Sequence, residues 1–191
     1  MPDPVWTSSY NYAQSPEQNG FTRTLYNDPV VTEITSGNPA NRRVEINSNN
    51  GDVVFLTSSV PSLDSSVGAT AEAVVNVSGA GDAGFELTFL NMGTLIQVLQ
   101  NSILLSFCND FGGYQEFLFS TSPNNVDITI RFTVDGSRQA RLYRNTVLID
   151  GPRTIPVCIK PFQRVLWWGE SGGTQIFKGM KYYIGGAVVP G

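Results

Sequence analysis

The chain has 191 residues, with 12 Lys plus Arg, 16 Asp plus Glu, a formal net charge of -4 and no histidine. Without histidine there is no Ser-His-Asp or Cys-His nucleophile, no imidazole base and no zinc site built on imidazole. The acidic balance also argues against sequence-independent binding of nucleic acid, which depends on Lys and Arg side chains that neutralise phosphates.

Short runs of alternating apolar and polar residues recur along the whole chain and are separated by glycine-containing turns. The best helical candidate, residues 94–100, is short and contains Ile and Val. Many short strands at this spacing indicate an all-β sandwich or barrel, and the absence of a linker predicts one domain over residues 1–191. The clearest expected strands are residues 21–26, 53–56, 69–77, 84–90, 103–107, 117–120, 127–134, 139–144 and 176–184.

Residues 127–150 are the most informative segment. Two alternating strands flank Asp135-Gly136, a dipeptide favoured in tight hairpins because its residues tolerate positive φ. A third short strand follows a turn at Arg144-Asn145. The segment therefore predicts a three-stranded meander.

Four short motifs in the last third of the chain combine turn residues with core residues. They are Val134-Asp135-Gly136, Leu142-Tyr143-Arg144-Asn145, Trp168-Gly169 and Phe177-Lys178-Gly179. In these motifs the chain resembles the laminin-G-like modules of the concanavalin A-like jelly rolls, although Asn145-Thr146 stands where that family usually has Asn-Gly or Asp-Gly. The resemblance implies a two-sheet antiparallel β-sandwich of about six strands a sheet, with an N-terminal strand near residues 5–12 beside a C-terminal strand near residues 181–189.

Glycosidases of this fold class use paired carboxylates, often as Glu-x-Asp-x-x-Glu on one strand, and that motif is absent. The acidic pair Asp82 and Glu86 is expected at a loop–strand junction without the required period. Glu170 is the best lone acid, because the apolar aromatic residues before it can raise a carboxyl pKa. A solvated loop position is the alternative for Glu170, so no catalytic residue is predicted.

A second enzyme hypothesis rests on Arg43, Glu45, Lys181 and Tyr183. These residues are similar to the Arg-Glu and Lys-Tyr strands of alginate-lyase-type enzymes, in which a tyrosine acts as acid or base. The Gln-Ile-His strand of those enzymes cannot exist in a chain without histidine. Aromatic and basic residues on a strand face remain the simpler explanation.

Aromatic side chains are the main candidates for ligand binding, since sugars stack their C–H faces on Trp and Tyr. Trp167 and Trp168 must point to opposite faces of a strand, so one is expected in the core and the other exposed or under a loop. The segment around Asp82 distantly resembles the Ala-Asp-Gly loop of legume-type lectins, although the order of residues differs. An ordinary hairpin turn is the alternative for this segment. The candidate ligand-binding residues are Trp167, Trp168, Glu170, Tyr114, Tyr183, Asp82 and Arg43.

Calcium is a recurrent ligand of this fold class, and residues 49–52 and 109–113 could supply part of an oxygen shell. Both segments are adequate as plain turns, so no metal or other cofactor is predicted and calcium stays an alternative. Cys108 and Cys158 lie in apolar contexts, which favours two buried free thiols over a disulfide.

Location follows only loosely from composition. The charged fraction is 15%, and a surface made polar by hydroxyls and amides is typical of extracellular or virion-associated β proteins. No apolar stretch is long enough to span a membrane, and no signal peptide is expected in the sequence. A cytoplasmic or virion-borne protein and a protein whose leader has been removed are both compatible with this pattern.

The leading hypothesis is a non-catalytic carbohydrate-binding or adhesion module that takes a glycan as its partner. The first alternative is a glycoside hydrolase or polysaccharide lyase of the same fold. The second is a structural virion or assembly component, an oligomer in which exposed aromatic residues form a subunit interface.

Overall fold

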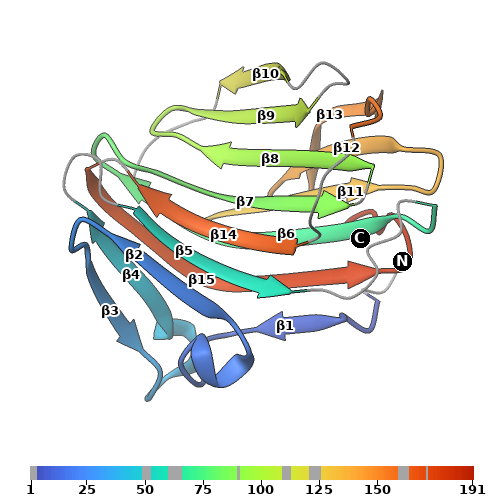
Figure 1. Cartoon of the computed structure of the whole chain (residues 1–191). Coiled ribbons are helices and arrows are strands. Elements are labelled where there is room, and N and C mark those ends of the chain that lie inside the picture. Colours follow the sequence, from blue (N-terminus) through green and yellow to red (C-terminus); the bar gives the residue numbers. More distant parts are fainter. Residues whose placement is uncertain are drawn as a thin grey trace.

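The computed structural model describes residues 4–48, 53–59, 66–89, 91–108, 113–120, 126–158, 164–170 and 172–191. These residues form two antiparallel sheets that pack face to face (Figure 1). The predicted all-β, two-sheet antiparallel sandwich is therefore confirmed. Two 3-10 turns, η1 (Glu17–Asn19) and η2 (Pro39–Asn41), are the helical elements in the described ranges. No helix in these ranges is long and apolar enough to cross a membrane.

The two sheets have more strands than the six apiece that were expected. Within the described ranges, sheet A has eight strands in the order β13-β12-β11-β6-β15-β4-β3, with β1 also paired to β15, and sheet B has seven in the order β10-β9-β8-β7-β14-β5-β2. The strands of sheet A are β1 (Ser8–Tyr10), β3 (Val30–Ile34), β4 (Arg43–Ser48), β6 (Ala69–Ser78), β11 (Ile128–Val134), β12 (Gln139–Arg144), β13 (Val147–Thr154) and β15 (Gly173–Ile184). The strands of sheet B are β2 (Thr22–Tyr26), β5 (Val53–Ser59), β7 (Asp82–Phe89), β8 (Met92–Val98), β9 (Ser102–Cys108), β10 (Tyr114–Ser120) and β14 (Arg164–Glu170). The helical candidate at residues 94–100 is thus wrong, because most of it belongs to β8.

The core between the sheets is filled by every second residue of each strand, as the pleat of a strand requires. Strand β7 contributes Phe85, Leu87 and Phe89, all fully or almost fully buried. From sheet A, Phe132 of β11 reaches across to Phe107 of β9, with the two ring centroids 6.4 Å apart. The residues between the core positions therefore face outward, where any ligand site on a sheet face must lie.

The β11–β12 hairpin differs in detail from the expected tight turn at Asp135-Gly136. Positive φ falls on Arg138 (+60°) rather than on Gly136, and the Arg138 N–H donates to the Asp135 carbonyl at 2.9 Å. The Asp135 carboxylate accepts two further backbone N–H bonds from the loop. Gly136 is required for a different reason, since a Cβ there would lie 2.0 Å from the Ser66 carbonyl oxygen. The meander itself is confirmed, because β11, β12 and β13 are neighbours in order.

Both ends of the described chain lie against sheet A. Strand β1 pairs with Met180–Tyr182 of β15, which confirms the expected pairing of the N-terminal and C-terminal strands. The hydroxyl of Thr70, on β6, donates to the Gly186 carbonyl at 3.0 Å and accepts the Val188 N–H at 2.9 Å. The segment after β15 therefore lies over part of the outer face of sheet A.

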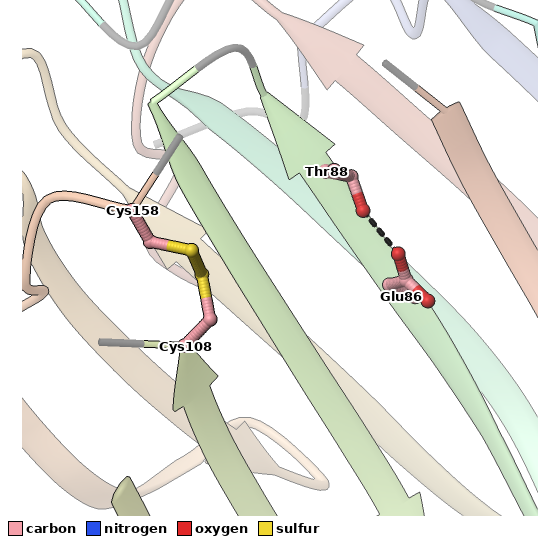
Figure 2. The surroundings of a disulfide bond; sticks show 4 residues. All are labelled: Glu86, Thr88, Cys108 and Cys158. Atoms are coloured by element: carbon pink, nitrogen blue, oxygen red, sulfur yellow. Dashed lines mark hydrogen bonds between the residues drawn. A yellow bond between two sulfur atoms is a disulfide. The ribbon is translucent and has the colours of Figure 1, made fainter. Parts of the chain in front are cut away.

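A disulfide joins Cys108, the last residue of β9, to Cys158, which follows β13 (Figure 2). The two Cα atoms are 5.9 Å apart and both side chains are buried. The Cys158 N–H donates to the Asn91 carbonyl at 3.0 Å, which fixes this segment beside the end of β7. The expectation of two free thiols is wrong, because an apolar context fits a buried disulfide equally well.

Replacing both cysteines with alanine is expected to lower the free energy of unfolding by about 2–4 kcal/mol. The bond closes a loop with a sequence separation of 50 residues, and opening it restores that conformational freedom to the unfolded chain. Urea unfolding of the two proteins measures the difference. Thiol labelling of the denatured, unreduced protein is the control, and stoichiometric labelling of both cysteines would contradict the assignment.

Candidate functional site

A pocket of about 240 Å³ lies on the outer face of sheet B, over β7, β8 and β14. Because Phe85 and Leu87 point into the core, Glu86 between them must point outward. The same alternation turns the other lining residues to this face. The pocket is lined by Glu86, Leu95, Gln97, Arg164, Leu166, Trp168 and Glu170.

The centre of the pocket depends on a close approach between Trp168 and Gly84, which are cross-strand partners. A Cβ on Gly84 would lie 2.5 Å from Cη2 of the Trp168 indole and 2.2 Å from the Ile96 carbonyl oxygen. The missing side chain at residue 84 lets the indole lie against the backbone of β7. Trp168 is consequently only 5% exposed, although it is on the outer face.

Trp167 points the other way and belongs to the core, so the expectation of opposite faces is confirmed. Its ring packs against Phe21 and Tyr182, with centroids 5.4 and 6.4 Å away. Trp167 is fully buried between the sheets and does not line the pocket. Of the two tryptophans, only Trp168 is placed to contact a ligand on sheet B.

An ion pair forms one end of the pocket. Arg164 donates from Nη2 and Nε to the two carboxylate oxygens of Glu86, at 3.0 and 3.3 Å. The Thr88 hydroxyl donates to the same carboxylate from two residues along β7 (Figure 2). With three donors, the Glu86 carboxylate is fixed in position and its charge is compensated.

Glu170 lines the other end, where β14 ends, and Asp82, the first residue of β7, lies beside it just outside the lining. They are direct cross-strand partners, so their side chains project from the same face. Asp82 is the first residue of β7, as a loop–strand junction requires, whereas Glu86 lies within the strand, and both side chains face outward. The segment at Asp82 is also a strand rather than the expected hairpin turn, which occupies residues 79–81.

Asp82 is a buried carboxyl group in an electrostatically unfavourable position. It is 6% exposed, and Gln97 donates from Nε2 to its Oδ2, while no described residue donates to its Oδ1. Burial raises the pKa of Asp82 to about 6, the Gln97 hydrogen bond opposes this rise, and the nearby charge of Glu170 adds to it. Asp82 therefore changes its charge near neutral pH.

The remaining predicted site residues lie elsewhere. Tyr114 begins edge strand β10 and is 56% exposed, on the same sheet but outside the pocket. Arg43, on β4 of sheet A, pairs with Glu45 at 3.4 Å. Tyr183, on β15, packs its hydroxyl end against the backbone of Gly185. The structure thus brings together three of the seven predicted residues, namely Trp168, Glu170 and Asp82.

A second charged cluster crosses the outer face of sheet A, and its charges are paired with one another. Glu72 stands opposite both Arg131 and Lys181, and its carboxylate oxygens lie 2.6 Å from Arg131 Nη2 and 2.7 Å from Lys181 Nζ. The Trp6 ring lies over both cations, 5.3 Å from Arg131 Cζ and 4.6 Å from Lys181 Nζ. Glu45 is opposite Ile176, five residues before Lys181 and so roughly 16 Å from it along the strand. The lyase-like set is therefore not assembled.

The expected calcium segments cannot be placed. Residues 49–52 and 109–112 lie outside the described residues. Within the described ranges, no group of three or more Asp, Glu or Cys side chains is arranged to hold a metal ion.

Three polar residues that line the pocket, Glu86, Gln97 and Arg164, were missed by sequence reasoning. The alternation at residues 84–90 already implied that Glu86 faces outward, and the same rule applies to Arg164 beside buried Val165. Gln97 was hidden because it falls in the helical candidate. The pairing of β7 with β14, which no local pattern reveals, is what joins these residues into one site.

Replacing Gly84 with alanine is expected to destabilise the fold by about 1–3 kcal/mol, because the new methyl group meets both the indole and a carbonyl oxygen. Displacement of Trp168 into water shifts its fluorescence to longer wavelength. Gly179→Ala is the matched control, since a Cβ there would make only an ordinary 3.8 Å contact with Val74. An unchanged spectrum in Gly84→Ala, or the same shift when Trp168 is Phe, would contradict this packing.

Replacing Asp82 with asparagine is expected to help stability more at pH 7.5 than at pH 4.5. The folded-state pKa of Asp82 is about 6, above the ordinary 3.8, so the cost of its charge is absent at low pH and complete above pH 6. The stability difference between variant and parent should therefore grow by about 1–2 kcal/mol between these pH values. Urea unfolding measures it, with exposed Asp28→Asn as control, and a difference that does not grow with pH would refute it.

Comparisons with known proteins identify the fold but no family. No protein-family model matches the sequence, and no curated protein matches it at a significant level. Solved structures that share the fold include the receptor-binding domain of botulinum neurotoxin type G, with a TM-score of 0.65 and 13% identity over 96% of this chain and 48% of that chain.

Two further neighbours have TM-scores of 0.64 and cover 88% of this chain and 44% of their own. One is the binding domain of botulinum neurotoxin DC in complex with SialylT, at 11% identity. The other is botulinum neurotoxin type C, whose cell entry is dependent upon interaction with two ganglioside molecules, at 12% identity. The chain spans less than half the length of these neighbours. At such identities the likeness shows the fold alone, which is a β-sandwich of the kind found in these binding domains.

Proposed function

We propose that the protein is a non-catalytic carbohydrate-binding module, a single concanavalin A-like jelly-roll domain that binds a glycan in the pocket on sheet B. The observation that carries the proposal is the position of Trp168, an indole on the outer face of a sheet surrounded by fixed polar groups. Sugars present apolar C–H faces and hydroxyl groups together, and this lining offers a partner for each.

The polar groups of the pocket are held ready for hydrogen bonding. Arg164 keeps about a third of its side chain exposed while bound to Glu86, and Gln97 is held by Asp82. A volume of about 240 Å³ is below the roughly 300–1,000 Å³ typical of sites for drug-sized ligands, which favours one sugar unit over a long chain. The site therefore suits a terminal or branching monosaccharide.

A binding role is favoured over catalysis by the state of the carboxylates. Glu86 accepts three hydrogen bonds from Arg164 and Thr88, which hold it in an ion pair rather than free to attack a sugar or take a proton. Asp82 lies four residues away on the same strand, roughly 13 Å along it, which exceeds the carboxyl spacing of both retaining and inverting glycosidases. The fold neighbours, which include receptor-binding domains, point in the same direction.

A buried disulfide supports an oxidising location such as the cell exterior or a virion surface, since disulfides persist there and are rare in the cytosol. The proposal accordingly places the protein outside the reducing cytosol. Maleimide labelling of the protein taken from its native compartment reports the redox state directly.

An assembly role is the second candidate, and edge strand β10 favours it. Tyr114 and Leu118 project from this strand and are 56% and 67% exposed. Exposed apolar side chains on a sheet edge can contact another copy of the chain, although the exposed Glu116 lies between these two on the same face. Light scattering that gives a stable oligomer, together with a glycan array that gives no signal, would favour this role over glycan binding.

Glycan binding is expected to depend on Trp168 and Arg164. On a glycan array, and then by calorimetry with the best ligand, Trp168→Phe and Arg164→Met should each weaken binding tenfold or more. Arg164→Met removes a charged hydrogen bond, which is worth about 1.5–3 kcal/mol. Trp168→Phe removes part of the aromatic surface on which a sugar stacks. Arg43→Met is the matched control, since Arg43 pairs with a glutamate on the outer face of the other sheet. Binding that survives both pocket substitutions would place the ligand elsewhere, and a blank array would refute the function.

A further inference from the structure

The charges around the pocket are unbalanced, and the excess is negative. The charged side chains that face outward on β7, β8 and β14 are three carboxylates and one guanidinium, and β5 contains no charged residue. Arg164 compensates Glu86 through its two hydrogen bonds. Asp82 and Glu170 are left as neighbouring carboxylates with no cation beside them on these strands.

A second feature of the same end is a missing hydrogen bond. Asp82 is 6% exposed and projects between Gln97 and Glu170, which both line the pocket. Its Oδ2 accepts from Gln97, but its Oδ1 has no donor among the described residues. Buried polar atoms nearly always have a partner, so this acceptor, next to two residues that line a pocket, is open to a donor from water or from a ligand.

We infer that the end of the pocket beside Asp82 and Glu170 receives a cationic group of the ligand, namely the free ammonium of an amino sugar. An ammonium carries three donors and a positive charge, so it can bond Glu170, which lines the pocket, and compensate both carboxylates at once. Trp168 stands beside this end, one outward position from Glu170 on β14, and a ring face attracts a cation. This inference rests on the proposed glycan-binding function and names its ligand class.

The same charges work against acidic sugars. The carboxylate of a sialic acid, or a sulfate group, would meet Asp82 and Glu170 at short range, where like charges repel strongly outside bulk water. The neighbour whose structure holds SialylT shares the fold at only 11% identity, so its ligand does not carry over. This pocket is therefore expected to discriminate against sialylated glycans.

The pH dependence of ligand binding provides a further test of this inference. Burial raises the pKa of Asp82 to about 6, with Glu170 adding to the rise, so Asp82 is mostly neutral at pH 5. Of the other charged groups that face outward on β7, β8 and β14, Glu170 is directly opposite Asp82, whereas Glu86 and Arg164 lie roughly 13 and 20 Å away along the strands. An amino sugar gains rather than loses positive charge from pH 7 to pH 5, so weaker binding at pH 5 reports the loss of charge on the protein.

The test compares three saccharides by calorimetry at pH 7. The probes are the disaccharide of glucosamine with free amines, its fully N-acetylated counterpart, and sialyllactose. The free-amine sugar is expected to bind at least tenfold more tightly than the acetylated one, and sialyllactose is expected not to bind. Asp82→Asn and Glu170→Gln should each remove most of this preference, whereas Glu45→Gln, on the outer face of sheet A, should leave it intact.

The outcomes separate the two proposals. Equal or tighter binding of the acetylated sugar, with dependence on Trp168 and Arg164, would overturn the inference and leave the glycan-binding function standing. Tight binding of sialyllactose in the same pocket would overturn the inference as well. A protein that binds none of the three probes and gives a blank glycan array would refute both. A preference for the free amine that falls at least fivefold from pH 7 to pH 5, and does not fall in Asp82→Asn, would support the inference.

Discussion

The contact between Trp168 and Gly84 is the constraint on which the outer face of sheet B depends. An indole can lie against the backbone of β7 only because residue 84 has no side chain. This packing buries Trp168 in the floor of a pocket that extends from the ion pair of Glu86 to the carboxylate of Glu170. The pocket therefore depends on the absence of a side chain at residue 84.

The buried carboxylate on the outer face of sheet A is paired with cations, whereas, among the described residues, the one on the outer face of sheet B is not. On sheet A, Glu72 is compensated by Arg131 and Lys181, and Trp6 covers both cations. Segments from both ends of the described chain lie on that side, so its charged cluster contributes to structure. On sheet B, the carboxylate of Asp82 is just as buried but faces a second acid. An uncompensated buried charge costs stability, and such a cost is typical of a site that a ligand completes.

The alternation of apolar and polar residues was enough to predict the sandwich, because each strand shows this alternation in its own sequence. It placed the phenylalanines of β7 on one face, put Trp167 and Trp168 on opposite faces, and predicted the meander of β11–β13. The pocket could not be predicted in this way, since it requires Asp82 to stand opposite Glu170, 88 positions later in the chain (170 minus 82). Cross-strand register between distant strands is set by the packing of the whole core, and no residue near either position encodes it.

Fold and ligand chemistry are therefore separate questions for this protein. The backbone arrangement is shared with binding domains at 11–13% identity, where almost every outward-facing side chain is free to differ. What a sheet face binds is decided by the few residues that alternate out of the core. Here they combine one indole, one compensated ion pair and two uncompensated carboxylates. Because the excess charge is negative and the unpaired atom is an acceptor, the complementary ligand group is a cationic donor, whatever the related folds bind.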